Sequence, residues 1–230
     1  MPRTKRYTPG GMVYHVLNRG VGRMTLFDED ADYRAFPRVV GETLRLAPKR
    51  ICGYCLMPNH WHFLLWPMGD DDLSTFMQRV TNTHAQRWQH HPHRVGHGHA
   101  YQGRFKSFPV EEDEYDYQVL RYIERNALRA ALVERAEDWR RSSLSSWRSS
   151  EPDETWPLAR PLPCGRAWSD HVNQPQTEGV VEASQRAIRR GAPLGSPTWV
   201  EATARRLALE STLRPRGRPK QPADNAIQDS

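Results

Sequence analysis

The sequence predicts an α+β fold, a ferredoxin-like split β-α-β sandwich in which helices pack on an antiparallel sheet. Strand-like and helix-like stretches follow one another in the order β-α-β-β-α-β-α over residues 1–147. The two middle strands are separated by only a few residues, which is typical of a hairpin. Hydrophobic residues make up 37% of the 230-residue chain, enough for one core of ordinary size.

Four strands are predicted from short stretches rich in β-branched and aromatic residues. In chain order they cover residues 12–17, 50–56, His60–Trp66 and 101–110. The third stretch carries apolar side chains on both faces, so we expect it to be a central strand covered on two sides.

Three helices are predicted from apolar residues spaced three and four positions apart. The first covers Asp30–Leu46, and Pro37 within it predicts a kink or a later helix start. The second follows the acidic residues 70–72 and has the clearest inner face: Leu73, Phe76, Met77, Val80, His84 and Trp88. The third covers residues 113–131, with an inner face made of Tyr115, Val119, Tyr122 and Asn126.

The chain is predicted to divide into a core domain at residues 1–147, a small, partly helical extension at 148–213 and a basic tail at 214–230. Helices are expected in the extension at residues 180–190 and from Ser196 onward. The tail contains Arg216 and Arg218 in a Pro-Arg-Gly-Arg-Pro-Lys run. This run resembles an AT-hook core, which binds the DNA minor groove, although a disordered basic tail would have the same composition.

The composition favours a nucleic-acid partner, because the formal net charge is +6 and the sequence pI is about 9.5. No stretch of about 18 apolar residues could cross a membrane, and no signal peptide is apparent, so we expect a cytoplasmic protein without membrane contact. Three cysteines are too few for a disulfide framework. Cys52 and Cys55 are expected to be buried thiols that face opposite sides of a strand.

Candidate metal ligands lie on the third strand, where His60 and His62 flank Trp61. Alternate residues of a strand face the same side, about 6 to 7 Å apart at their Cα atoms, so the two imidazoles could share one metal ion. Taken alone, the pattern is more typical of two polar residues on a half-buried face than of a metal site.

A candidate nucleophile lies on the third helix, where Tyr122 and Asn126 are one turn apart on the same face. Of the three tyrosines on this helix, only Tyr122 is followed four residues later by an amide. The alternative is that Tyr122 is a core aromatic and Asn126 caps the helix.

These residue types together suit phosphodiester chemistry. A metal on His60 and His62 can polarise a phosphate oxygen while the Tyr122 hydroxyl attacks phosphorus and forms a covalent 5′-phosphotyrosine. Mg²⁺ is the expected ion, and a site with two imidazoles and an amide oxygen would also accept Mn²⁺.

Three blocks of sequence carry a family resemblance: residues 57–66 (MPNHWHFLLW), 101–106 (YQGRFK) and 121–130 (RYIERNALRA). Over roughly residues 5 to 147 the chain resembles the single-tyrosine HUH transposases, particularly the REP-associated tyrosine transposases. The resemblance implies that His60 and His62 are metal ligands, Tyr122 is the nucleophile and Asn126 is the third ligand. The family usually has Asn-Pro where this chain has Asn126-Ala127, and losing the proline is expected to lengthen the helix.

The resemblance also implies a substrate: single-stranded DNA beside hairpins such as repetitive extragenic (REP) palindromes. It further implies DNA contacts near the cleavage site from Gly10, Gly11, Asn18 and Arg19. Five basic residues surround the proposed site in sequence and are expected to bind phosphate, unless they form only a solvated basic face: Arg104, Lys106, Arg121, Arg125 and Arg129. The sequence does not decide between a monomer and a homodimer.

Two other functions remain open at this point. One is a catalytically silent DNA-binding regulator with the same fold, and the other is a zinc hydrolase in which His60 and His62 activate water. A tyrosine transesterase would lose its activity with Tyr122→Phe, whereas the hydrolase would keep it.

Overall fold

The computed structural model describes residues 7–90, 94, 98–148, 158–159 and 166–214. One antiparallel sheet with the strand order β2-β3-β1-β4 forms its centre. The strands are β1 Val13–Arg19, β2 Arg50–Met57, β3 His60–Trp66 and β4 Lys106–Val110. This order, with β2 and β3 as a hairpin, is that of a split β-α-β sandwich, so the predicted fold class is confirmed.

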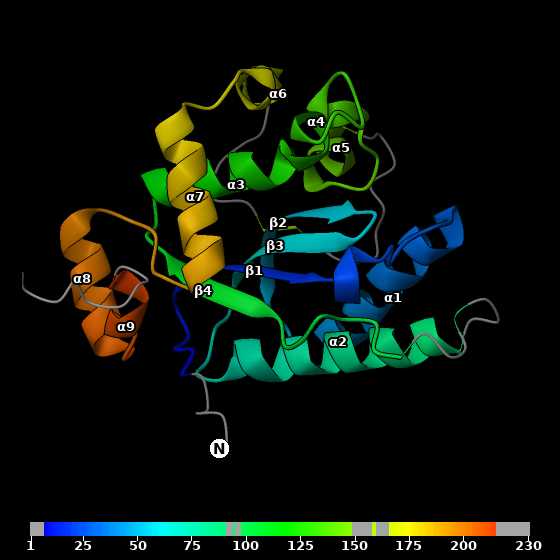
Figure 1. Ribbon diagram of the computed structural model, residues 1–230, viewed down its shortest axis with the longest axis horizontal. Helices are drawn as coiled ribbons and strands as arrows, with labels where there is room; N and C mark the ends of the chain where they lie inside the picture. The colour runs from blue at the N-terminus through cyan, green and yellow to red at the C-terminus, as the bar shows by residue number, and fades with distance from the viewer. Residues whose placement is uncertain (1–6, 91–93, 95–97, 149–157, 160–165, 215–230) are drawn as a thin grey trace, which may run out of the picture.

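Helices cover both faces of the sheet (Figure 1). In chain order they are α1 Asp30–Leu46, α2 Asp72–Gln89, α3 Glu114–Glu124, α4 Asn126–Arg129, α5 Ser143–Arg148, α6 Arg166–Asn173, α7 Glu178–Arg190, α8 Pro197–Arg206 and α9 Glu210–Leu213, with short 3₁₀ turns at Val21–Arg23 and Ala136–Asp138. Helices α1 and α2 lie on one face of the sheet and α3 lies on the other. The central strands are therefore covered on both sides, as the apolar faces of β3 predict.

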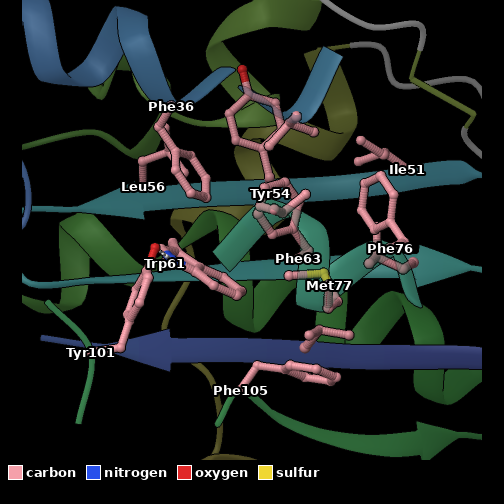
Figure 2. Close-up of a cluster of buried hydrophobic side chains, with 14 of the residues drawn as sticks. Phe36, Ile51, Tyr54, Leu56, Trp61, Phe63, Phe76, Met77, Tyr101 and Phe105 are labelled. Carbon is pink, nitrogen blue, oxygen red and sulfur yellow. Dashed lines mark hydrogen bonds between the residues drawn. The ribbon is translucent and has the colours of Figure 1, made fainter. Parts of the chain in front are cut away.

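The core between the sheet and helices α1 and α2 is largely aromatic (Figure 2). Trp61 is fully buried, and its indole N–H donates a hydrogen bond to the Tyr101 hydroxyl over 3.1 Å. That hydroxyl lies 2.6 Å from Nδ1 of His84. All six residues predicted to face inward on α2 are buried. Trp61, Trp88 and Tyr101 thus belong to the core and are not free to stack on nucleic-acid bases.

Trp61→Ala is expected to lower the free energy of unfolding by about 3 to 5 kcal/mol, because it opens a large cavity in this core. Trp147→Ala is the matched control, since Trp147 is 36% exposed; its expected cost is less than about 1 kcal/mol. Urea unfolding followed by circular dichroism measures both. Equal losses in the two variants would contradict the central position of Trp61.

Helix α3 is held close to β2 by Gly53. A β-carbon at this position would lie 2.2 Å from Cδ1 of Leu120, so either the buried Leu120 side chain or the helix that carries it would have to shift. Leu120 and its neighbours Val119 and Ile123 are buried against this face. The close approach fixes how far the side chains of α3 stand from those of β3.

Cys52 and Cys55 are buried thiols that form no disulfide among the described residues, as predicted. The prediction that they face opposite sides was wrong, because both belong to the cluster on the α3 side of the sheet. The register of β2 with β3 shifts between Ile51 and Gly53. Such a bulge lets residues three apart share a face.

The predicted bounds of the first helix are confirmed: α1 covers Asp30–Leu46 and continues past the buried Pro37, without a later start. The predicted start of the fourth strand was wrong. Strand β4 begins only at Lys106, since Tyr101 makes a single isolated bridge to Gly20.

The third helix does not run on to residue 131, and the missing proline does not lengthen it. Helix α3 ends at Glu124, and one further turn, α4, starts at Asn126. Between them Arg125 has φ −80° and ψ −3°. Its guanidinium donates hydrogen bonds to the backbone carbonyls of Val172 and Asn173. These contacts join residues far apart in the sequence, so the local sequence pattern does not predict them.

The C-terminal helices pack on the core. Helix α7 contacts both α3 and β4, and the backbone of Leu194 bonds to Pro109 and Glu111 over 3.0 and 2.9 Å. Buried Glu124 accepts hydrogen bonds from Ser143 and from the indole of Trp168 over 2.6 and 2.7 Å. The helices predicted at 180–190 and from Ser196 are present as α7 and α8.

The division at residues 147 and 213 stays a prediction. Arg216 and Arg218 lie outside the described residues. Within the described part of the chain, no helix is both long enough and apolar enough to span a bilayer.

Candidate metal and tyrosine site

The two strand histidines lie side by side on the face of the sheet that α3 covers. Their ring centroids are 5.1 Å apart. Nδ1 of His60 lies 2.6 Å from Oδ1 of Asn59, and Nδ1 of His62 lies 2.8 Å from Nε2 of His15. Each imidazole therefore has one ring nitrogen occupied by a neighbour, which leaves Nε2 for another partner.

Tyr122 reaches the same place from α3. Its ring centroid lies 6.2 Å from that of His62 and 6.2 Å from that of His15. Its side chain is 94% buried, with an exposed fraction of 6%, yet it lines the pocket that contains both strand histidines. The structure thus brings the predicted nucleophile and the predicted metal ligands together.

Asn126 and Arg129 complete this cluster. Arg129 donates a hydrogen bond from Nη2 to Oδ1 of Asn126 over 2.9 Å, and its Cζ lies 3.9 Å from the centroid of the Tyr122 ring. Nη1 of Arg129 and Nδ2 of Asn126 are buried and have no hydrogen-bond partner among the described residues. Two donors are therefore available to an acceptor that enters the pocket.

The pocket has a volume of about 830 Å³ and carries basic side chains around the histidines and the tyrosine. Its lining includes five residues predicted to bind DNA: Asn18, Arg19, Arg104, Lys106 and Arg129. Ile188 and Arg189 of α7 also line it. The C-terminal extension therefore shapes the site, which the sequence did not indicate.

Four other predicted DNA contacts lie elsewhere. The guanidinium of Arg121 donates to the carbonyls of Gln174 and Pro175, just after α6. That of Arg125 donates to the carbonyls of Val172 and Asn173, at the end of α6. Neither arginine lines the pocket. Their guanidinium groups face the C-terminal part of the chain around the end of α6, and their contact with DNA stays a prediction. Gly10 and Gly11 precede β1, whereas the pocket lies near its last residue, Arg19.

Comparison with known proteins identifies the family. The family model for IS200-like transposases matches residues 10–126, which is about half of the chain and includes both histidines and Tyr122. The chain belongs to the IS200-like transposase family.

Two solved structures resemble this transposase. One is a REP-associated tyrosine transposase bound to a REP hairpin, with 22% identity and a TM-score of 0.51; the alignment covers 73% of this chain and 96% of that one. The other is a proposed transposase from Deinococcus radiodurans R1, with 19% identity and a TM-score of 0.39, covering 54% and 97%. No curated protein matches the sequence. The first likeness supports the fold.

The electrostatics of the transposase site keep its histidines neutral. Burial lowers the pKa of His15 and of His60 to about 3, with further lowering by Arg129. Burial also holds the pKa of His62 well below its ordinary value, and the nearby His15 adds to this effect. A neutral imidazole keeps a nitrogen lone pair, which is what a metal ion requires.

The donor set fits a divalent cation of the Mg²⁺ or Mn²⁺ type. Among the described residues, no group of three or more His, Cys, Asp or Glu side chains is placed to hold a metal. The pocket instead offers two imidazoles and the amide oxygen of Asn126. An ion bound by so few protein groups keeps free positions for phosphate oxygens.

His15 is the site residue that sequence reasoning missed. It lies on β1, directly across from Leu64 and diagonal to His62 in the register of β1 with β3. Its alternation with Val13 and Leu17 placed it on the α3 face, but only the strand register brings it to His62. A buried histidine flanked by apolar residues is the one signal that could have drawn attention to it.

Proposed function

We propose that this transposase is a metal-dependent endonuclease and strand transferase for single-stranded DNA, which cuts through a 5′-phosphotyrosine at Tyr122. The observation that carries the proposal is the convergence of His60, His62 and Tyr122 on one basic pocket. If Tyr122 were only a core aromatic and the two histidines only polar surface residues, nothing would require them to line the same pocket.

Tyr122 performs the covalent step. Its Oη attacks phosphorus, forming the Oη–P bond while the P–O3′ bond breaks, so the DNA on the 3′ side of the cut stays attached through its 5′-phosphate. The phenolic proton leaves to solvent and the departing 3′-oxygen takes up a proton. A 3′-hydroxyl attacking the phosphotyrosine reverses the step, so strands are rejoined without an external energy source.

His60, His62 and Asn126 would hold Mg²⁺ or Mn²⁺. The bound ion would polarise the phosphodiester oxygen and favour ionisation of the nearby phenol. Asn126 would have to share its oxygen between the ion and Arg129, whose Nη2 already bonds to it.

Arg129 would act on the reacting phosphate. Its guanidinium lies over the Tyr122 ring, and its buried Nη1 has no partner among the described residues. A fixed cation over the ring that carries the attacking oxygen would stabilise the charge that develops in the transition state. Arg19, Arg104 and Lys106 would bind phosphates along the strand.

The proposed substrate is a single strand beside a hairpin such as a REP palindrome. Support comes from the structure with the same fold that holds a REP hairpin and from the net charge of +6. Single-stranded DNA leaves the backbone accessible to a tyrosine that is itself 94% buried.

The test is incubation with hairpin oligonucleotides and Mg²⁺ or Mn²⁺, followed by denaturing electrophoresis. A 3′ label is expected to move with the protein, and a 5′ label is expected to appear in a shorter free strand. Fully duplex DNA of the same sequence is the control and should stay uncut. Binding without cleavage would favour the silent regulator, and cleavage without any adduct would favour the zinc hydrolase.

Arg129→Ala is expected to slow strand cleavage by about 10²-fold, as for removal of one transition-state donor. Hairpin binding should weaken much less. The slope of the logarithm of the binding constant against the logarithm of the salt concentration should become shallower by about the amount that one phosphate contact contributes. Arg87→Ala is the control, because Arg87 pairs with Glu42 outside the pocket lining. Cleavage at the wild-type rate in Arg129→Ala would exclude a role for this guanidinium in the reaction.

A further inference from the structure

We propose that His15 is a positioning residue, which accepts a hydrogen bond from Nδ1–H of His62 and so keeps the Nε2 lone pair of His62 free for the metal. This inference rests on the proposed function, because it assigns His15 a task within the proposed metal site. His15 itself is not placed as a ligand.

The contact between the two rings is enclosed and close. His15 has an exposed fraction of 0%, and its Nε2 lies 2.8 Å from Nδ1 of His62. Its ring packs edge-on against Phe108, with centroids 4.9 Å apart, and lies 6.2 Å from the Tyr122 ring. Packing on these sides leaves the ring little freedom to turn away.

Only two proton arrangements fit this contact between neutral rings. In one, His62 carries its proton on Nδ1 and donates to His15, which leaves Nε2 of His62 with a lone pair. In the other, His15 donates to His62, and the proton of His62 must then sit on Nε2, where it blocks a metal. A metal on Nε2 of His62 therefore requires His15 to be the acceptor.

The neighbouring histidine is arranged in the same way by a different group. Nδ1 of His60 lies 2.6 Å from Oδ1 of Asn59. The orientation of this amide is fixed, because its Nδ2 donates to the carbonyl of Arg23 over 3.2 Å. An amide oxygen only accepts, so His60 carries its proton on Nδ1 and has a free Nε2. In this arrangement both predicted ligands, His60 and His62, donate Nδ1–H to a neighbouring acceptor and keep Nε2 free for the metal.

The remaining nitrogen of His15 has no partner within the described part of the chain in either proton arrangement, so it does not choose between them, but it argues against a purely structural role. Its Nδ1 is buried and has no hydrogen-bond partner among the described residues. If Nε2 accepts, this Nδ1 carries the proton and is an unsatisfied buried donor. Such groups are rare and occur mainly where function requires them. If His15 served only to fill the core, an apolar side chain of similar size would stabilise the fold more, because it would leave no unsatisfied polar atom.

The test compares His15→Phe, which keeps the ring volume, with His15→Gln, whose side-chain oxygen can accept from His62. Nitrogen-15 NMR of the metal-free protein reports the tautomer of His62, and isothermal titration with Mn²⁺ reports affinity. In the wild type we expect the Nδ1–H tautomer of His62. His15→Phe is expected to bind Mn²⁺ about 10- to 100-fold more weakly, with partial recovery in His15→Gln.

His84→Gln is the matched control, because His84 is a buried imidazole on the opposite face of the sheet, bonded to Tyr101. Its Mn²⁺ affinity should equal that of the wild type. An Nε2–H tautomer of His62 in the wild type, or unchanged Mn²⁺ affinity in a folded His15→Phe protein, would overturn the role of His15 alone. Wild-type Mn²⁺ binding that is indifferent to His60→Ala would instead contradict the proposed metal site, and the positioning role with it.

Discussion

Tyr122→Phe is expected to abolish the covalent DNA–protein adduct and to lower the rate of strand cleavage by about 10⁴-fold or more. The variant removes only the attacking oxygen, and loss of a nucleophile costs at least this much in enzymes that use one. The ring stays in its place between His62 and Arg129. Denaturing electrophoresis with a 3′-labelled hairpin measures both the adduct and the cleaved strand.

Tyr115→Phe is the control for this experiment, since Tyr115 lies on the same helix outside the pocket lining. It should form the adduct at the wild-type rate. Fluorescence anisotropy should show that Tyr122→Phe still binds the hairpin within a few-fold of the wild type. An adduct that persists in Tyr122→Phe would assign the nucleophile to another residue, and adduct-free cleavage that survives would point to a hydrolase.

His60→Ala is expected to weaken Mn²⁺ binding more than about 100-fold, because loss of a ligand should exceed the cost of losing an outer-shell partner. Cleavage at limiting metal should fall in parallel, whereas hairpin binding should change little. His60 is half-buried and sits at the start of β3, so the substitution leaves the core intact. Isothermal titration and the cleavage assay measure the two effects.

His90→Ala controls for metal held by the histidine-rich segment after α2, since His90 is exposed at the C-terminal end of that helix. It should leave the tight Mn²⁺ site and the cleavage rate unchanged. Tight Mn²⁺ binding that survives His60→Ala but is lost with His90→Ala would place the metal in this histidine-rich segment and remove its link to catalysis.

The parts of this fold that local periodicity encodes were predictable. The inner face of α2 and the bounds of α1 follow from apolar spacing alone. The same holds for the shared face of His60 and His62, because strand alternation is a property of neighbouring residues. Tyr122 and Asn126 stay one turn apart even though the helix is interrupted between them at Arg125.

The parts that depend on distant contacts were not predictable. Arg121 and Arg125 do not line the pocket, because their guanidinium groups donate hydrogen bonds to carbonyl oxygens 47 to 54 residues later in the chain. His15 joins the site only through the register of β1 with β3. Ile188 and Arg189 line the pocket because α7 packs on α3 and β4. None of these contacts can be inferred from the spacing of residues that are close together in the sequence.

We propose that His60 and His62 hold one divalent cation beside the Tyr122 hydroxyl. Anomalous diffraction from crystals of the transposase soaked in Mn²⁺ tests it most directly. We predict a single strong peak about 2.1 to 2.3 Å from Nε2 of both histidines, inside the pocket lined by Tyr122. Crystals in which Mn²⁺ binds only elsewhere, with both imidazoles free of metal, would contradict the account.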